Sequence, residues 1–215
     1  GVTAVFFSSY GFLEQVRDAV PASERSLIVA EARADAQGAD VLSDLGAYET
    51  RLRQLVADHG RAYLFGVYQG KLAEGADFRS NLLKTVVCVS IPMEYPALFH
   101  ERLEALYAGR FAKIAEALGD NAQAKAREYA RDRLSLSLVL QACGRGIRNE
   151  ADRCVFVLLD QRYHEYGWRR FLDPRPYNLR QPAGNAADFH RERAGMTGPA
   201  WDPALLEHTQ GEKPR

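Results

Sequence analysis

The chain has 215 residues, of which 47% are hydrophobic, and its 28 basic residues balance its 28 acidic residues. A chain of this length buries one sizeable core, so we expect one main domain with additions rather than several domains. The balanced charge excludes a uniformly basic nucleic-acid binder, although arginines gather locally in residues 145–180. No apolar run is long enough for a membrane span, so no membrane partner is expected.

Short apolar runs alternate with helical patterns along the first four-fifths of the chain. Strands are predicted at residues 1–7, 26–30, 62–67, 84–91 and 153–159. Helices are predicted at residues 12–20, 41–59, 97–118 and 122–140, with a short one at 168–172. This alternation predicts an α/β domain with a mainly parallel sheet flanked by helices. Residues 176–215 are rich in Pro, Gly, Asn and charge, which predicts an extended or partly disordered tail.

The three cysteines, Cys88, Cys143 and Cys154, form no Cys-x-x-Cys pair, and each lies among apolar residues. We therefore expect buried thiols in a reducing compartment, cytoplasmic or nuclear rather than secreted. The five histidines contain no His-x-x-x-His pair. The sequence thus predicts no metal site of its own.

Four residues near the end of the 122–140 helix, Gln141, Gly144, Arg145 and Arg148, stand at i, i+3, i+4 and i+7. If one helix continues through all four, they share one face. Arginine forks match phosphate oxygens, so this row suits a polyanionic ligand, whereas an ordinary solvated arginine face is the alternative. The apolar residues expected to anchor this helix to the core are Leu136, Val139, Leu140, Cys143 and Ile147.

Residues 66–71 (GVYQGK) fall short of a phosphate-binding loop. Three residues separate the glycines where the loop needs four, and Leu72 follows the lysine in place of Ser or Thr. The chain is therefore not expected to hold Mg-ATP alone. In residues 70–78 (GKLAEGADF), two glycines allow close approach to a ligand, and Glu74 and Asp77 offer acceptors. A strand–helix connection whose acids cap the next element is the alternative.

Ser8, Ser9 and Tyr10 follow the first predicted strand and precede a helix. Hydroxyl and N–H groups at such a position bind phosphate, although a plain N-cap is the alternative.

Four stretches together resemble one family: residues 5–10 (VFFSSY), 70–78, 141–148 (QACGRGIR) and 160–163 (DQRY). Their order and spacing are similar to motifs IV, V and VI and the following strand end of XPD-type superfamily 2 helicases, with the DinG helicases as near relatives. The resemblance covers about residues 2–175. Its motif V form, GKLxEGxDF, is much more specific than the widespread QxxGRxxR of motif VI. Two residues depart from the usual pattern: Ala76, where Ile or Val is common, and Cys154, where Gly is frequent.

The resemblance implies that residues 1–175 are a RecA-like motor domain, the second of two in a 5′–3′ DNA helicase of nucleotide excision repair type. A first motor domain, not part of this sequence, would hold ATP and Mg and carry the iron–sulfur cluster. The isolated chain is accordingly expected to be inactive as an ATP hydrolase. In this reading Arg145 and Arg148 are catalytic arginine fingers and Gln141 positions the nucleotide. The remaining residues implied on the nucleotide side are Glu74, Gly75, Asp77 and Gly144.

The partners implied are single-stranded DNA and the first motor domain. The residues implied in DNA contact are Ser8, Ser9, Tyr10, Lys71, Trp168 and Arg169. Arg162 is expected to pin Asp160 or a neighbouring helix instead. A second hypothesis makes the chain a docking module for a repair or transcription protein, because residues 201–206 form an apolar island in the polar tail.

Overall fold

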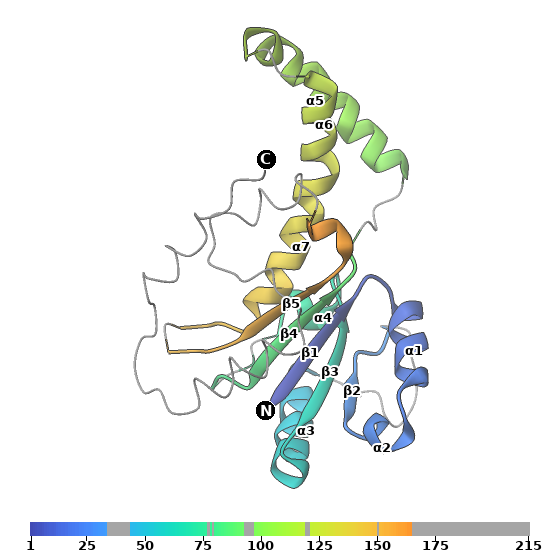
Figure 1. The fold of residues 1–215 in the computed structure, drawn as a ribbon, viewed down its shortest axis with the longest axis vertical. Coiled ribbons are helices and arrows are strands. Elements are labelled where there is room, and N and C mark those ends of the chain that lie inside the picture. Colours follow the sequence, from blue (N-terminus) through green and yellow to red (C-terminus); the bar gives the residue numbers. More distant parts are fainter. Residues whose placement is uncertain are drawn as a thin grey trace, which may run out of the picture.

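The computed structural model describes residues 1–33, 44–76, 78, 80–92, 97–118, 121–149 and 151–164. Within them a five-stranded sheet has the order β2-β3-β1-β4-β5, and each neighbouring pair of strands is parallel (Figure 1). The strands are β1 (Val2–Phe7), β2 (Ile28–Ala30), β3 (Ala62–Val67), β4 (Leu83–Val89) and β5 (Val155–Leu159). Helices flank the sheet on both faces, so the predicted α/β fold of RecA-like type is confirmed.

The side chains of β1 alternate between two cores, as the period of two in a strand requires. Val2, Ala4 and Phe6 belong to the larger core, which also takes α3 (Leu45–His59), α4 (Lys71–Glu74) and α7 (Arg133–Gly144). Phe7 belongs to the smaller core, which it forms with Leu13 of α1 (Tyr10–Ala19) and with the end of β3. The helix α3 ends as predicted at Gly60, whose φ of 75° suits glycine.

A helical arm extends from the sheet between β4 and β5 (Figure 1). It consists of α5 (Ala97–Leu118), α6 (Ala122–Arg127) and the π-helical turn η1 (Glu128–Asp132), which continues into α7. Two buried acids stabilise the arm: Glu104 lies 3.4 Å from Arg131, and Glu128 lies 3.2 Å from Arg133. The predicted pair of helical regions is therefore confirmed, with η1 as an unpredicted irregularity.

The prediction that one helix carries Gln141 through Arg148 is wrong, because α7 ends at Gly144. Arg145 closes the helix with its N–H on the Ala142 carbonyl at 3.1 Å, and Arg148 lies beyond it. The apolar anchors before this point pack into the core as expected. Ile147, by contrast, is 44% exposed, because it follows the end of the helix.

Three short elements had no counterpart among the predictions: α2 (Ala22–Arg25), α4 and the 3-10 turn η2 (Gln161–His164). Of the cysteines, Cys88 is buried, whereas Cys143 and Cys154 are half-buried, so only the first is fully as predicted. The Cys88 and Cys143 sulfurs lie 3.7 Å apart, and this contact together with burial raises the pKa of Cys88. None of the described helices is long and apolar enough to cross a membrane.

Candidate functional site

The three motif regions meet at the carboxyl edge of the sheet, where parallel strands place their following loops. Phe7 pairs with Val67 at the ends of β1 and β3, so the loops after these strands are neighbours. Two turns build most of the site. We call residues 66–75 the Gly70 turn and residues 144–149 the arginine turn.

The arginine turn is tied to the chain just after the Gly70 turn. Arg145 Nη1 and Arg148 Nη2 both donate to the carbonyl oxygen of Ala76, at 2.9 and 2.6 Å. Arg145 is half-buried, and Arg148 is exposed. One main-chain oxygen therefore brings together two guanidinium groups that the sequence placed on a common helix face.

Asp152 fixes the backbone of the arginine turn. Its Oδ2 accepts the N–H of Arg148 at 2.7 Å and that of Asn149 at 3.1 Å, and the residue is only 8% exposed. Sequence reasoning missed Asp152. The signal that could have found it is Asn149 followed closely by an aspartate after a helix end, since such residues accept main-chain N–H groups in turns.

The other nucleotide-side candidates lie around these two turns. Glu74 is exposed at the end of α4, and Gly75 closes that helix with its N–H on the Lys71 carbonyl at 2.9 Å. Gly144 is exposed, and a Cβ added there would meet no atom within 4 Å among the described residues. Gln141 is exposed and lines a groove of about 430 Å³ on α7. Asp77 lies outside the described residues.

The Gly70 turn does not offer a cradle for ATP phosphates. Glu31, which follows β2 and is 4% exposed, places its carboxylate against this turn and accepts the Val67 N–H through Oε2 at 3.2 Å. A Cβ at position 70 would overlap both carboxylate oxygens. A negative charge thus fills the space that a phosphate-binding loop leaves for phosphate. That the chain does not hold Mg-ATP alone stays a prediction.

Two of the residues predicted to contact DNA, Ser9 and Tyr10, lie at a second groove. Ser9, Tyr10, Gly11, Arg33, Val67 and Gln69 line a space of about 350 Å³. Ser9 caps α1 by accepting the Phe12 N–H at 3.2 Å, as the alternative to phosphate binding supposed. The Arg33 guanidinium lies 5.7 Å from the centre of the Tyr10 ring. Sequence reasoning gave no DNA role to Arg33 or Gln69. Arg33 belongs to no motif, and Gln69 lies in residues 66–71, which fall short of a phosphate-binding loop.

Burial and, secondarily, the nearby Glu31 carboxylate raise the pKa of Tyr10 to about 12. The hydroxyl of Tyr10 therefore stays protonated near neutral pH and can donate a hydrogen bond. Ser8 is half-buried beside it. Lys71 is exposed, and its ammonium lies 4.9 Å from the centre of the Tyr48 ring. Trp168 and Arg169 lie outside the described residues.

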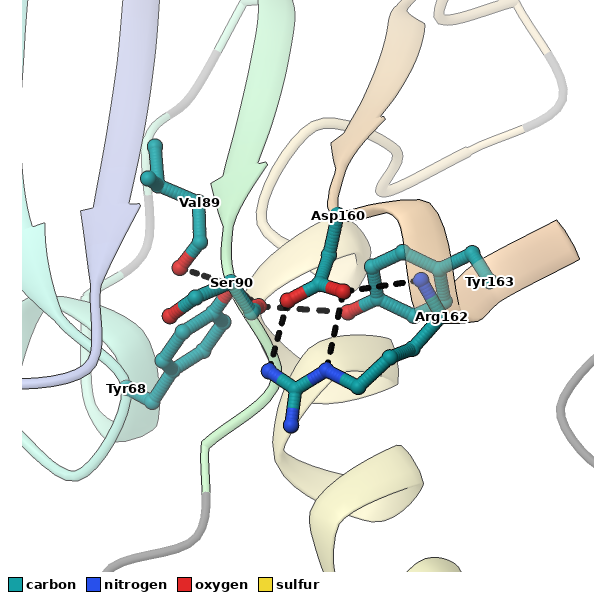
Figure 2. Close-up of polar contacts among 6 residues, drawn as sticks. All are labelled: Tyr68, Val89, Ser90, Asp160, Arg162 and Tyr163. Carbon is teal, nitrogen blue, oxygen red and sulfur yellow. Dashed lines mark hydrogen bonds and ion pairs between the residues drawn. The ribbon is translucent and has the colours of Figure 1, made fainter. Parts of the chain in front are cut away.

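Arg162 holds Asp160 at the end of β5, as predicted (Figure 2). Its Nε lies 2.9 Å from Oδ1 and its Nη2 lies 2.6 Å from Oδ2, and this pairing lowers the pKa of Asp160. Figure 2 also shows that Tyr68 and Tyr163 converge on Ser90, each donating to its carbonyl oxygen, at 3.0 and 3.4 Å. These contacts stabilise the strand ends beside the site rather than line a groove.

No group of three or more His, Cys, Asp or Glu side chains among the described residues is arranged to hold a metal ion. The chain has three cysteines in all, fewer than the four thiolates that usually hold an iron–sulfur cluster.

Residues 1–174 match the protein family described as the helicase C-terminal domain. The ATP-dependent DNA helicase CHL1 of Saccharomyces cerevisiae is 28% identical over 177 residues, which cover 80% of this chain and 20% of the relative. A human protein, putative ATP-dependent DNA helicase DDX11-like protein 8, is 31% identical over 173 residues, covering 76% of this chain and 18% of that one. The chain spans about a fifth of the length of these relatives.

The family match extends over four-fifths of the chain, and the relatives carry the name of DNA helicases. Both agree with the resemblance carried by motifs IV, V and VI. The chain belongs to the helicase C-terminal domain family and is a C-terminal domain of an XPD/DinG-type superfamily 2 helicase.

Proposed function

We propose that this chain acts as the second motor domain of an ATP-dependent DNA helicase. The observation that carries the proposal is the meeting of Arg145 and Arg148 on the Ala76 carbonyl. A guanidinium carries its N–H donors in a rigid fork, a geometry that matches the oxygens of a phosphate. Two such groups fixed by main-chain contacts form a preorganised site for developing negative charge.

In this mechanism ATP and Mg are held by a first motor domain, which faces the arginine turn across a cleft. Arg145 and Arg148 stabilise the charge on the γ-phosphate during transfer to water, and Gln141 orients the nucleotide or the facing domain. The residues proposed on the nucleotide side are also Glu74, Gly75, Asp77 and Gly144. An arginine finger of this kind contributes roughly 10³–10⁵ in turnover. Closure and opening of the cleft then move the two domains along one DNA strand in the 5′–3′ direction.

Single-stranded DNA is proposed to run along the groove lined by Ser9 and Tyr10, beside Ser8. The Arg33 guanidinium supplies the positive charge that a DNA backbone requires there, and the Tyr10 ring offers a face for stacking. Contacts from Lys71, Trp168 and Arg169, a role in nucleotide excision repair and a nuclear or nucleoid location rest on the resemblance alone and stay predictions.

The test is ATP hydrolysis by this chain alone, and by a protein that also contains a first motor domain, each with and without single-stranded DNA. The proposal expects no turnover by the chain alone and DNA-stimulated turnover by the two-domain protein. Steady hydrolysis by the chain alone would mean that it holds its own ATP and metal, and the proposal would fail.

A second candidate is a docking module for a repair or transcription protein. It is favoured by the apolar side chains exposed on α5, where Leu98 is 60%, Leu106 51% and Ile114 54% exposed. Leu106→Glu and Ile114→Glu in the two-domain protein separate the candidates. A motor domain keeps its DNA-stimulated hydrolysis in these variants, whereas a docking module loses its partner.

A further inference from the structure

The two arginines of the arginine turn are held by different parts of the structure. Arg145 is the C-cap of α7, and its N–H donates to the carbonyl oxygen of Ala142 at 3.1 Å. The main chain at Arg145 therefore follows the helix. Arg148 lies beyond the helix, and its N–H donates instead to the side chain of Asp152, at 2.7 Å. The position of Arg148 thus depends on a side chain from farther along the chain.

A single carboxylate oxygen of Asp152 closes the arginine turn. Oδ2 accepts the N–H groups of both Arg148 and Asn149, the second at 3.1 Å. The main chain of Asp152 adds a third contact, because its own N–H donates to the Asn149 carbonyl at 3.1 Å. Local contacts of this kind from an aspartate set the course of the main chain in a turn. The point from which the Arg148 side chain leaves the main chain is set in the same way.

Asp152 is itself anchored to the sheet. It lies three residues before β5, which pairs with β4, and it is buried. Acidic side chains are rarely buried unless they are paired, so the two N–H groups on its carboxylate account for its place. The arginine turn also sits directly on this strand, since a Cβ added at Gly146 would overlap Sγ of Cys154, the residue before β5. Asp152 therefore places Arg148 relative to the sheet.

The far end of the Arg148 side chain is held separately. Its Nη2 donates to the Ala76 carbonyl at 2.6 Å, and Ala76 is buried and directly follows the Gly70 turn. A long side chain held at both ends keeps one conformation, whereas one held at a single end takes up several rotamers. Loss of the Asp152 carboxylate would leave the Ala76 contact without its support from the main chain.

We propose that Asp152 is a positioning residue for Arg148, because it holds the main chain from which this guanidinium reaches the nucleotide. The inference rests on the proposed function, in which Arg148 stabilises charge on the γ-phosphate, and it names the residue that sets the place of that charge. Groups that stabilise a developing charge act best when they are already in place, because reorganisation during the reaction costs free energy. Asp152 provides this order for the arginine that the helix does not hold.

A purely structural role for Asp152 predicts different kinetics. Loss of hydrogen bonds lowers stability, and a less stable protein contains fewer active molecules without any change in how each one works. Loss of a positioning residue acts through its partner, so it has no further effect once that partner is removed. It also slows the catalytic step without weakening the binding of ATP, which the first motor domain holds in the proposed function.

The experiment measures kcat and KM for ATP, with saturating single-stranded DNA, in a protein that contains both motor domains. The temperature lies below the unfolding midpoint of every variant. In Asp152→Ala we expect kcat to fall about 10²-fold, the cost of misplacing a catalytic group by about 1 Å, with KM unchanged. Asp152→Ser has a side chain too short to accept both N–H groups, so it should show the same change and replaces the alanine variant if that one does not fold.

Two further variants separate the lost contact from a general loss of structure. Asp152→Asn should keep most of the wild-type kcat, because one amide oxygen has two lone pairs and can accept both N–H groups. The matched control is Asn121→Ala in the arm, which removes a side chain that accepts the main-chain N–H of Ala124 at 3.0 Å. This control should keep the wild-type kcat.

A double variant tests whether the effect passes through Arg148. Arg148→Ala lowers kcat by itself, and adding Asp152→Ala should lower it no further. A further fall in the double variant would overturn the proposal, since a general loss of structure predicts it. So would a wild-type kcat in Asp152→Ala, or a kcat in Asp152→Asn as low as that in Asp152→Ala. A wild-type rate in Arg148→Ala alone would overturn the proposed function itself, which is a distinguishable result.

Discussion

The Gly70 turn and the arginine turn meet at Ala76 but differ in what surrounds them. Around Gly70 the chain is closed on itself: Glu31 is 4% exposed, and its carboxylate occupies the space where a side chain at position 70 would lie. Around Gly144 the surface is open, and Arg148 is exposed although its guanidinium is held by a main-chain oxygen. The Gly70 turn is completed by a side chain of its own domain, so it serves the fold. The arginine turn places positive charges on an open surface, which suits the docking of a second domain.

The largest effect is expected at the arginine turn, on the open surface. In a protein with both motor domains, Arg148→Ala should lower DNA-stimulated ATP hydrolysis by about 10³, because a guanidinium at the γ-phosphate is removed. Arg148 is exposed, so the unfolding midpoint should change little. The matched control is Arg51→Ala on the exposed surface of α3, which should keep its activity. Normal turnover by Arg148→Ala would remove the arginine-finger assignment.

A smaller effect on activity is expected at Gly144. A Cβ there meets nothing within the described structure, so Gly144→Ala should leave the free energy of unfolding unchanged or raise it by up to about 1 kcal/mol. If a facing domain approaches this backbone closely, hydrolysis should nevertheless fall about tenfold, roughly 1.4 kcal/mol in the barrier. Gly109→Ala on α5, equally open, is the control. Equal activity of the two variants would argue against close docking at Gly144.

On the closed side the expected effect is on stability. Gly70→Ala should lower the free energy of unfolding by about 1–3 kcal/mol, because its Cβ overlaps the Glu31 carboxylate. Urea titrations of Gly70→Ala, Glu31→Ala and the double variant measure the coupling between them. The double variant should recover part of the loss, since the overlapping group is gone. Strict additivity would show that the two residues do not meet as described.

The smallest effect is expected at the ion pair of Figure 2. Arg162 lowers the pKa of Asp160 below its ordinary value of 3.8, so the pair stabilises the fold above that pH and the contribution is lost as pH falls through the lowered pKa. Asp160→Asn should therefore cost about 1 kcal/mol near neutral pH. The difference between variant and wild type should shrink below pH 3.8. A difference that grows on acidification would contradict the pairing.

The contribution of Glu31 to stability changes with pH in the opposite direction. Its pKa is raised in the folded protein, so the cost of its buried charge is present at neutral pH and disappears as pH falls toward the ordinary value of 4.5. Glu31→Gln should therefore be more stable than the wild type at pH 7, and this advantage should narrow on acidification. Thermal unfolding of both proteins between pH 7 and pH 5 measures it. If the unfolding midpoint of the wild type instead falls further below that of the variant as pH falls, the carboxyl is not buried as described.

The sequence-level patterns predicted the sheet well, because each strand is a short apolar run and such runs have few ways to be buried. They predicted the end of α3 equally well, because Gly60 is a local signal. The end of α7 was missed because the spacing of Gln141 through Arg148 continues to look helical. What stops the helix is tertiary: Asp152 and the Ala76 carbonyl hold the following turn, and neither lies within the pattern.

In the candidate site, too, some residues could be predicted from the sequence and others could not. Motif spacing selected Arg145 and Arg148, and the structure brings both to one oxygen. Glu31 could not be selected, because it follows an ordinary buried strand and its importance depends on Gly70 leaving room for it. The glycine was read as an approach for a ligand, yet the group that approaches it is a side chain of the same domain. Local sequence cannot distinguish these two occupants.

The role of the arginine turn is tested by binding of ADP with aluminium fluoride, which mimics the γ-phosphate during transfer, in a protein with both motor domains. Wild type, Arg145→Ala and Arg148→Ala should bind ADP alone with similar affinity. Only the wild type should form the tight complex with aluminium fluoride, because the arginine turn contacts the transferring group. If both variants form that complex as tightly as the wild type, the arginine turn does not complete the ATP site.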